Sequence, residues 1–386
     1  MKIRGNMKKK IALIFGGRSV ERDISVITAV QTFKSLDDKK YAVTPIFIYE
    51  GDFYTGNLKT LKDFAPFVPT AHKKLVLFGG TFCQVKKNKL IPLFKPDVVV
   101  NCCHGGEGEN GILSGVLEFN GLAHTSPKVL PSALCMDKTA SKIQFDSLFL
   151  NTAKGKSFSL DDYKRDESAV IEDVEAYLEY PMIVKPAHLG SSIGISLAHN
   201  TDELKFAIDV AVEFDDKILV EHKLSNFVEV NCAAFKYKDE IVISETEQPL
   251  SKSDFLSFED KYSTGKMSGG GHIIPANIGN LNQQIKDTTM LLYDRLELDG
   301  VVRFDYLVDT EREKIYINEV NTVPGSLAYY LFERVGISFS DMMDKIIEQA
   351  EVDFLDKKSR TRNFTTDILL SFNSGAKHPK SGVKEL

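Results

Sequence analysis

The feature that most constrains the fold is a pair of apolar runs that each end in a glycine-rich turn. "KIALIFGG" spans residues 10–17, and "PDVVVNCCHGG" spans residues 96–106. Unbroken apolar runs of this length are typical of strands buried on both faces, as in a parallel sheet. After the first run, apolar residues recur at helical spacing from Ile24 to Phe33. This alternation of strand and helix predicts a parallel α/β sheet for about residues 7–125.

Ligands of parallel α/β sheets bind beyond the carboxyl ends of the strands. Both glycine-rich turns fall at such ends, and they carry Glu21 and His104. From spacing alone, Glu21 is better explained as a solvated acid near a helix terminus, and His104 as a loop histidine bonded to backbone. Glu107 and Glu109 are interpreted as solvated loop groups or as groups that support the site.

The pattern changes near Pro131, where hairpins replace the strand–helix alternation. We expect one helix over residues 132–150, a helix capped by Thr201, and a closing helix over residues 340–350. We divide the chain into an N-terminal α/β domain, a central α+β domain, a C-terminal domain with a polar loop, and a Lys-rich tail. Their residues are 7–125, 126–223, 224–350 with the loop at 251–271, and 351–386.

Composition argues against several classes of protein. The net charge is −6 and apolar residues make up 43% of the chain, which argues against nucleic acid or an acidic membrane as the main partner. No apolar run approaches the roughly 18 residues of a membrane span. The five cysteines and eight histidines lack metal-ligand spacing. We therefore expect reduced thiols in a cytoplasmic protein and no zinc site.

The stretch "VRFDYLVDTEREKIYINEVNTVPG" (302–325) predicts two strands joined by a polar turn. Side chains two apart in a strand emerge on one face, so Arg303 and Asp305 share a face, as do Glu319 and Asn321. Oxygen ligands suit Mg²⁺ shared with substrate phosphates, and a guanidinium matches a phosphoryl group in transfer. A solvated hairpin with surface ion pairs is the alternative. The apolar "SLAYYLF" that follows favours a walled pocket.

The stretch "IVKPAHLGSSIGIS" (183–196) predicts two short strands about a Gly/Ser turn. Lys185 ends the first strand, and the backbone donors of a turn that contains Ser191 and Ser192 can fold over phosphates. An ordinary glycine-rich hairpin is the alternative. The chain contains no Walker GxxxxGK[ST] motif. The predicted strand "ILVEHKL" (218–224) could offer backbone groups to an adenine ring.

Together these motifs resemble those of the D-alanine–D-alanine ligases, members of the ATP-grasp superfamily, over about residues 8–350. The motifs occur in the family's order: "GGRSVERDIS", "NCCHGGEGENG", "MDKTASK", "VKPAHLGSSIG", "VEHKL", "FEDKY" and "RFD…NEVNTVPG". The resemblance implies a three-domain ATP-grasp fold, ATP as co-substrate, and a pair of Mg²⁺ or Mn²⁺ ions. It also implies a cytoplasmic homodimer that acts on D-alanine in peptidoglycan precursor synthesis.

The resemblance assigns each motif a role. The catalytic residues would be Glu21, Ser191, Tyr262 and Arg303. The amino acid substrates would contact His104, Gly325, Ser326, Tyr330 and Leu331. ATP would contact Lys138, Lys185, Ser192, Glu221, Lys223, Leu224, Glu229 and Lys261. The metal ligands would be Asp305, Glu319 and Asn321.

The sequence departs from the family pattern at three places. Where the family has a glutamate for the ribose hydroxyls, the simplest register places Phe227, and Glu229 lies two residues further on. No serine stands where the family often binds the second substrate's carboxylate, so Tyr330, Leu331 or Ser326 is the candidate. His188 stands in a loop that is often charged in the family. Tyr262, where makers of D-alanyl-D-lactate tend to have histidine, predicts an amine as the second nucleophile.

The reaction that the resemblance implies has two steps. The carboxylate of one D-alanine attacks the γ-phosphate of ATP, and the amine of a second D-alanine then displaces phosphate from the D-alanyl phosphate. Positioning and charge neutralisation suffice for phosphoryl transfer, so no side chain needs to become acylated. The alternatives are an ATP-grasp ligase with a different second amino acid and a nucleotide-binding regulator without turnover.

Overall fold

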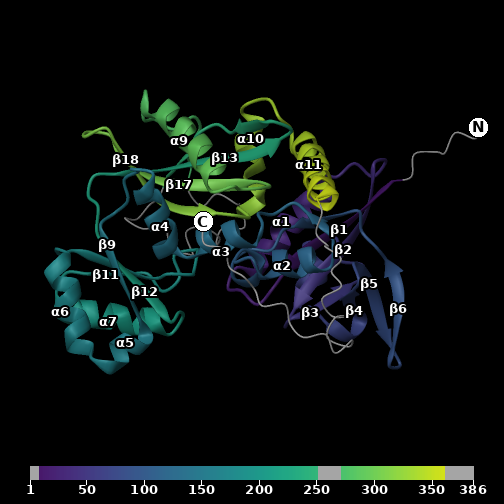
Figure 1. Ribbon diagram of the computed structural model, residues 1–386, viewed down its shortest axis with the longest axis horizontal. Coiled ribbons are helices and arrows are strands. Elements are labelled where there is room, and N and C mark those ends of the chain that lie inside the picture. Colours follow the sequence, from purple (N-terminus) through teal and green to yellow (C-terminus); the bar gives the residue numbers. More distant parts are fainter. Residues whose placement is uncertain (1–7, 251–270, 361–386) are drawn as a thin grey trace, which may run out of the picture.

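The computed structural model describes residues 8–250 and 271–360. These residues form three large sheets (Figure 1), and the parts of the chain built around them are called here the N-terminal, central and C-terminal domains. Lys261, Tyr262 and all but the last residue of the predicted 251–271 loop lie outside the described residues, as does the tail from residue 361. Within the described part of the chain, every helix is too short or too polar to cross a membrane.

The N-terminal domain contains an eight-stranded sheet in the order β6-β5-β4-β3-β2-β1-β7-β8. Its strands are β1 (Lys9–Gly16), β2 (Tyr41–Tyr49), β3 (Asp52–Thr55), β4 (Lys73–Phe78), β5 (Thr81–Lys86), β6 (Lys89–Phe94), β7 (Val98–Asn101) and β8 (Ala123–His124). The predicted parallel pairing is confirmed for β2, β1, β7 and β8. The prediction lacked the antiparallel extension β3–β6, because those strands are short and two of them, β4 and β6, are largely exposed.

Helices cover both faces of β1, as expected for a fully buried strand. Ile11, Leu13 and Phe15 pack with α1 (Arg22–Ser35) on one face, whereas Ala12 and Ile14 pack with α2 (Ile112–Phe119) on the other. Short 3₁₀ turns complete the domain: η1 (Leu61–Phe64), η2 (Pro69–Ala71) and η3 (Gly106–Gly108). The glycine-rich turns that follow β1 and β7 therefore meet at one edge of the sheet.

The central domain is a four-stranded antiparallel sheet in the order β11-β10-β12-β9. Its elements are β9 (Gly155–Ser159), α5 (Leu160–Arg165), α6 (Glu167–Tyr177), β10 (Met182–Pro186), β11 (Ser196–Ala198), α7 (Thr201–Val212) and β12 (Lys217–His222). The predicted hairpin about the Gly/Ser turn is confirmed by the pairing of β10 with β11. The predicted cap is one residue out: Asn200, not Thr201, accepts the amide hydrogen of Glu203 and caps α7.

The C-terminal domain is a four-stranded antiparallel sheet in the order β14-β13-β17-β18. Its strands are β13 (Val228–Tyr237), β14 (Glu240–Ile243), β17 (Val302–Asp309) and β18 (Lys314–Asn321), with a small pair, β15 (Gln248–Pro249) and β16 (His272–Ile273), beside it. One face of β17 carries apolar side chains that pack against α9 (Leu281–Arg295). The opposite face carries the polar residues of the site.

The single helix predicted over residues 132–150 is instead two helices, α3 (Val129–Met136) and α4 (Lys138–Ser147). Asp137 separates them because its backbone is extended, and its carboxylate caps α4 by accepting from the amides of Thr139 and Ala140. Cys135 and Phe145 pack in the core of the C-terminal sheet, so these helices belong with that sheet rather than with the central one.

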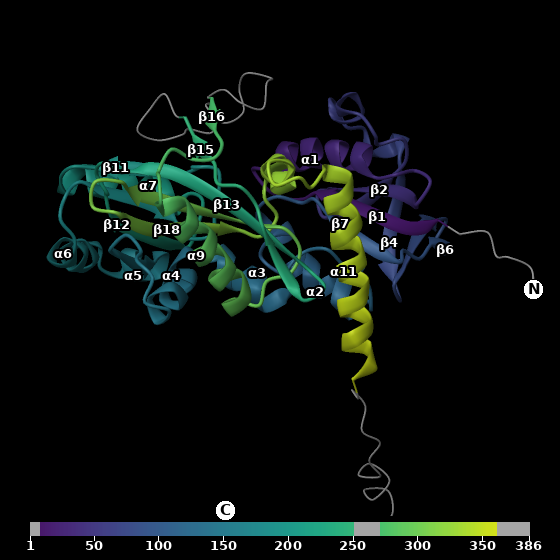
Figure 2. The same ribbon diagram turned by 90° about the horizontal axis from the view of Figure 1, so that it is seen from above.

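The closing helix α11 (Phe339–Ser359) is longer than predicted and includes the start of the expected tail. It follows η4 (Gly325–Ala328) and α10 (Tyr329–Glu333). Figure 2 shows α11 running along the junction of the N- and C-terminal domains. Met342, Ile346 and their neighbours pack in one core with β7 of the first sheet and β13 of the third. The two domains therefore share a hydrophobic core, whereas the central domain has its own.

Candidate active site

A cavity of about 110 Å³ lies between the central sheet and the polar face of the C-terminal sheet. Its walls include many of the residues predicted to bind ATP or metal: Lys138, Lys185, Ser192, Glu221, Leu224, Glu229, Asp305 and Glu319. Phe227 and Glu229 both line it, so both candidates for the ribose contact remain. The backbone N–H of Lys223 donates to the carbonyl of Pro181, so that donor is used within the protein.

The four polar residues of the β17–β18 hairpin lie on one face, as predicted from their spacing. In the strand register Arg303 pairs with Asn321, and Asp305 pairs with Glu319. Arg303 donates to both carboxylate oxygens of Asp305, at 2.6 and 2.8 Å, and the Asn321 amide donates to Oδ2 of Asp305 at 3.0 Å. Burial opposes the charge on Arg303, but Asp305 outweighs it and raises the pKa of the guanidinium well above its ordinary value. The arginine is therefore a permanent cation.

A buried group of charges forms the opposite wall. Glu221 on β12 is 3% exposed and forms ion pairs with Lys185 on β10 and with Lys142 on α4. Burial by itself would raise the pKa of Glu221, but the two ammonium groups lower it below its ordinary value. Sequence analysis missed Lys142, although it stands one helical turn after Lys138 and could have been identified by that spacing.

The glycine-rich loop after β10 reaches the N-terminal domain. The hydroxyl of Ser191 donates to Oε1 of Glu21, so the residues expected to act together do meet. Ser191 has a positive φ of 53°, a backbone conformation that is uncommon for residues other than glycine. The carboxylate of Glu21 also lies against Gly105, where an added Cβ would approach Oε2 to 2.5 Å. Glu21 thus stands between the glycine-rich turns of two domains.

His104 holds protein segments together through both of its ring nitrogens. Nδ1 donates to the carbonyl of Val323 at 2.6 Å, which leaves Nε2 to accept from the hydroxyl of Thr28 at 2.7 Å. Thr28 in turn accepts from the amide of Ser326 at 2.9 Å. Burial lowers the pKa of His104 to about 4, so the ring is neutral. In this structure His104 positions the 323–326 segment instead of offering a free nitrogen to a substrate.

Glu109 supports the same segment and is not a solvated loop group. Its carboxylate accepts from the amides of Gly105 at 2.6 Å and Val323 at 2.8 Å. Burial, followed by the charge of Glu21, raises the pKa of Glu109 to about 7. For Glu109 the sequence left open a solvated and a supporting role, and Thr28 was not predicted at all, because a buried loop acid or a helix threonine has no local sequence signature.

The segment after the polar hairpin contains the predicted contacts of the amino acid substrates. An added Cβ at Gly325 meets no atom within 4 Å, so the backbone there faces open space. Ser326 is buried, and its hydroxyl has no hydrogen-bond partner among the described residues. Ser326, Leu327 and Ala328 all have positive φ, a strained conformation for side-chain-bearing residues. Strain of this kind is concentrated at functional sites.

Tyr330 and Leu331 are placed differently from the expectation. The Tyr330 hydroxyl donates to Oε2 of Glu247 at 2.9 Å, so its proton is not available to a carboxylate. Glu247 is 1% exposed and is also held by Asn231 and by an ion pair with His272. The Leu331 side chain lies in the hydrophobic core. Of the three candidates for binding the second carboxylate, Ser326 alone presents a hydroxyl whose proton is uncommitted within the described residues.

Comparisons with known proteins agree with this geometry. The family model described as "D-ala D-ala ligase N-terminus" matches residues 10–127, and that described as "D-ala D-ala ligase C-terminus" matches residues 145–348. The D-alanine--D-alanine ligase of Thermosipho melanesiensis is 38% identical over 362 residues, covering 90% of this chain and 95% of the relative. That of Thermosipho africanus is 36% identical over 365 residues, covering 93% and 97%.

Solved structures are similar over the same extent. The VanG D-Ala:D-Ser ligase of Enterococcus faecalis superposes with a TM-score of 0.76 at 29% identity, covering 89% of this chain and 100% of that one. The D-alanine–D-alanine ligase of Helicobacter pylori gives a TM-score of 0.73 at 26% identity, covering 88% and 98%. The fold, the placement of the motifs and these full-length matches together establish that the chain belongs to the D-alanine–D-alanine ligase family.

Proposed function

We propose that this chain joins two D-alanine molecules to D-alanyl-D-alanine at the expense of ATP, for the synthesis of peptidoglycan precursors. The observation that carries the proposal is the polar face of the β17–β18 hairpin. It opposes Lys185 and Lys138 across a cavity within a chain of this family. In a solvated surface hairpin, the alternative interpretation, these groups would face water and would not line a cavity.

The side chains around the cavity can bind and neutralise the nucleotide phosphates. Lys138, Lys185 and the permanently charged Arg303 supply positive charge where phosphoryl transfer needs it. Asp305, Glu319 and Asn321 fit a hard divalent cation because they place oxygen donors on one face of a rigid strand pair. We propose that they hold a pair of Mg²⁺ or Mn²⁺ ions, which when bound would neutralise charge on the phosphate oxygens.

The amino acid substrates are assigned to the junction of the three domains. The carboxylate of Glu21, held by Ser191, suits the ammonium group of the first D-alanine. The carboxylate oxygen of that D-alanine attacks the γ-phosphorus, and ADP leaves with the bonding electrons. The amine nitrogen of the second D-alanine, once deprotonated, attacks the acyl carbon, and inorganic phosphate leaves. We assign the second carboxylate to Ser326, because its hydroxyl and the open space at Gly325 lie side by side in the chain.

The proposal is tested by coupled phosphate release with product mass analysis. Purified protein with Mg·ATP should release phosphate only when D-alanine is added, and the product should have the mass of the D-alanyl dipeptide. ATP binding without release in the presence of any D-amino acid would favour the non-catalytic regulator and would contradict the proposal.

A second candidate function differs in the second substrate. The similarity to a structure named a D-Ala:D-Ser ligase favours D-serine as an alternative nucleophile. Among the described residues, the hydroxyl of Tyr330 donates its hydrogen to Glu247. Its oxygen can therefore accept a hydrogen bond from the hydroxyl of a substrate. A competition assay with equal D-alanine and D-serine distinguishes the two. We expect the D-alanyl-D-alanine mass to predominate.

We also propose that the protein works as a homodimer in the cytoplasm. Phe119 on α2 and Leu130 on α3 are 91% and 75% exposed, which is apolar surface that a second copy would cover. The five cysteines are buried and unpaired, as is usual in a reducing compartment. Light scattering of the purified chain should give twice the mass of one chain, and a monomer at micromolar concentration would contradict the dimer.

A further inference from the structure

We propose that protonated His188 is a positioning residue that anchors the glycine-rich loop to Asp215 and Asp137, so that ATP binding weakens as pH rises. The proposal rests on the proposed function only in taking this loop as the ATP-phosphate loop. His188 lies between Lys185 and Ser191 in the chain but lines a separate cleft and not the nucleotide cavity, and the roles assigned above do not use it.

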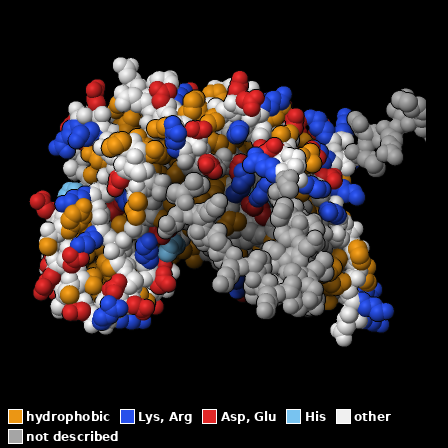
Figure 3. Space-filling view, viewed as in Figure 1, with side chains coloured by type: hydrophobic (Ala, Val, Ile, Leu, Met, Phe, Trp, Pro, Cys, Tyr) orange, Lys and Arg blue, Asp and Glu red, His pale blue; other side chains and the backbone are white. Residues whose placement is uncertain are grey.

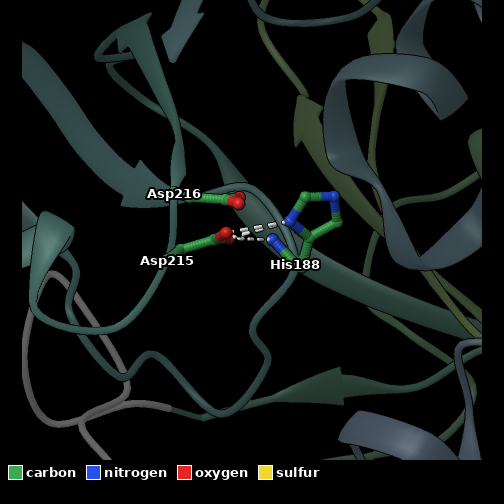
Figure 4. A group of neighbouring side chains, drawn as sticks. All are labelled: His188, Asp215 and Asp216. Carbon is green, nitrogen blue, oxygen red and sulfur yellow. Dashed lines mark hydrogen bonds and ion pairs between the residues drawn. The ribbon is translucent and has the colours of Figure 1, made fainter. Parts of the chain in front are cut away.

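The geometry is that of a double attachment. The backbone amide of His188 donates to Oδ2 of Asp215 at 2.7 Å, and ring Nδ1 lies 2.9 Å from Oδ1 of the same carboxylate (Figure 4). On the other side of the ring, Nε2 is 3.5 Å from Oδ2 of Asp137. Only an imidazolium carries a proton on both nitrogens. Loss of one proton therefore costs one of the two ring contacts.

The anchor is connected directly to the groups that face phosphate. Asp137 caps α4, whose first residue is Lys138. The amide of Lys138 donates to the carbonyl of Ala187 at 3.0 Å, and its ammonium donates to the carbonyl of Leu189. Residues 187 and 189 flank His188. A shift of the loop at His188 would therefore move the carbonyl that orients the Lys138 ammonium.

The surrounding charges favour the imidazolium. Asp215 and Asp137 attract it, and Lys217, which donates to Oδ2 of Asp137 at 2.7 Å, opposes it. Asp161 and Asp216 line the adjoining open cleft. The hydrogen bond with Asp215 raises the pKa of His188, and burial opposes that rise. Because the folded-state pKa is raised, the anchor is complete at low pH and is lost as pH rises through that pKa.

A metal site is the alternative interpretation of this cluster, because the possible ligand atoms of His188, Asp215 and Asp216 lie within 4.8 Å of one another. The geometry favours the anchor. Asp215 bonds both the amide and the ring of His188, which is the pattern of an anchor, and Asp216 is exposed (Figure 4). The ammonium of Lys217 beside Asp137 also disfavours a second cation.

The test measures kcat and the KM for ATP between pH 6 and 9 in the whole protein and in His188→Gln. For the unaltered protein, the KM for ATP should rise about fivefold across this range, as expected when the partly exposed ion pairs of the imidazolium with Asp137 and Asp215 lose their charge. In His188→Gln the KM should be high and independent of pH, with kcat changed less than about twofold. Asp215→Asn should move the rise to lower pH, because the imidazolium loses its main partner.

His199→Gln is the matched control, because His199 pairs with Glu203 at 2.9 Å on the exposed surface of the same domain. It should retain the pH dependence of the unaltered protein. Persistence of that dependence in His188→Gln, or a fall in kcat with the KM unchanged, would overturn the proposal. Binding of a non-hydrolysable ATP analogue, measured over the same pH range, separates the two proposals. If the analogue binds more weakly at high pH but D-alanine does not stimulate turnover, the anchor is supported and the ligase function is refuted. If the analogue does not bind at all, both proposals are refuted.

Discussion

The β17–β18 hairpin and the glycine-rich loop after β10 face each other across the cavity, but different forces hold their side chains in place. In the hairpin, the strand register alone brings Arg303 beside Asn321 and Asp305 beside Glu319. In the loop, Ser191 and its neighbours are held by groups from distant segments: Glu21, Lys138 and Asp215. The hairpin is therefore a locally determined site, whereas the loop depends on the relative placement of all three domains.

The contrast extends to the surfaces around the two regions. In the space-filling view, Lys and Arg side chains are interspersed with Asp and Glu over the described parts of this face (Figure 3). At the site, opposite charges are instead paired inside the molecule: Arg303 with Asp305, Lys185 with Glu221, and Lys138 with Glu319. Burial strengthens such pairs, since exposed charges are screened by water and salt.

The largest expected effect on activity comes from removing the arginine side chain of the hairpin. Arg303→Ala should lower kcat on the order of 10³-fold, because it removes a charge that stabilises the transferring phosphoryl group. Nucleotide binding should remain largely intact, since the lysines stay. Steady-state kinetics and nucleotide titration measure the two effects. Arg312→Ala, at an exposed arginine in the turn of the same hairpin, should leave both unchanged. Turnover that survives Arg303→Ala would show that the arginine has another role.

The next largest effect is on stability, and it concerns the buried charges around Glu221. Glu221→Gln should lower the free energy of unfolding by about 3 kcal/mol, because it leaves two buried ammonium groups without their carboxylate. Urea denaturation followed by circular dichroism measures the change. Glu167→Gln, which breaks an exposed pair with Lys205 in the same domain, should shift the midpoint very little. Equal shifts in the two variants would mean that the buried charges are not coupled.

A smaller effect is expected where the loop meets the N-terminal domain. Gly105→Ala would push against Glu21 Oε2, which the added Cβ would approach to 2.5 Å. We expect kcat/KM for D-alanine to fall on the order of 50-fold, because a displaced carboxylate misorients the first substrate. Gly121→Ala, also at a positive φ but with no atom near the added Cβ, controls for backbone strain. A similar loss in both variants would attribute the effect to strain alone.

The smallest effect tests the support of the segment between the two regions. Thr28→Val removes the hydroxyl that links His104 to the amide of Ser326. We expect the KM for D-alanine to rise about fivefold, with ATP kinetics preserved, because two buried polar groups lose their partner. Thr32→Val, one turn along α1 and bonded only weakly to Cys102, should be neutral. An unchanged KM in Thr28→Val would show that the segment needs no support from α1.

Much of the fold could be predicted from local pattern. The buried strand β1, the polar hairpin and the hairpin about the Gly/Ser turn are confirmed, because strand periodicity is a property of neighbouring residues. The break at Asp137 and the antiparallel strands β3–β6 were missed. An aspartate inside a helical pattern does not by itself reveal an extended backbone. Short strands also contain too few residues to show the apolar pattern by which longer strands are recognised.

The sequence by itself determined the shared face of Arg303, Asp305, Glu319 and Asn321, because the pleat of a strand directs alternate side chains to the same side. Only the tertiary structure decided that Glu21 meets Ser191, that Glu221 is shared by Lys185 and Lys142, and that His104 supports the Val323 segment. These pairs are far apart in the chain. Their contact depends on how three separately formed sheets pack, and no local pattern records that.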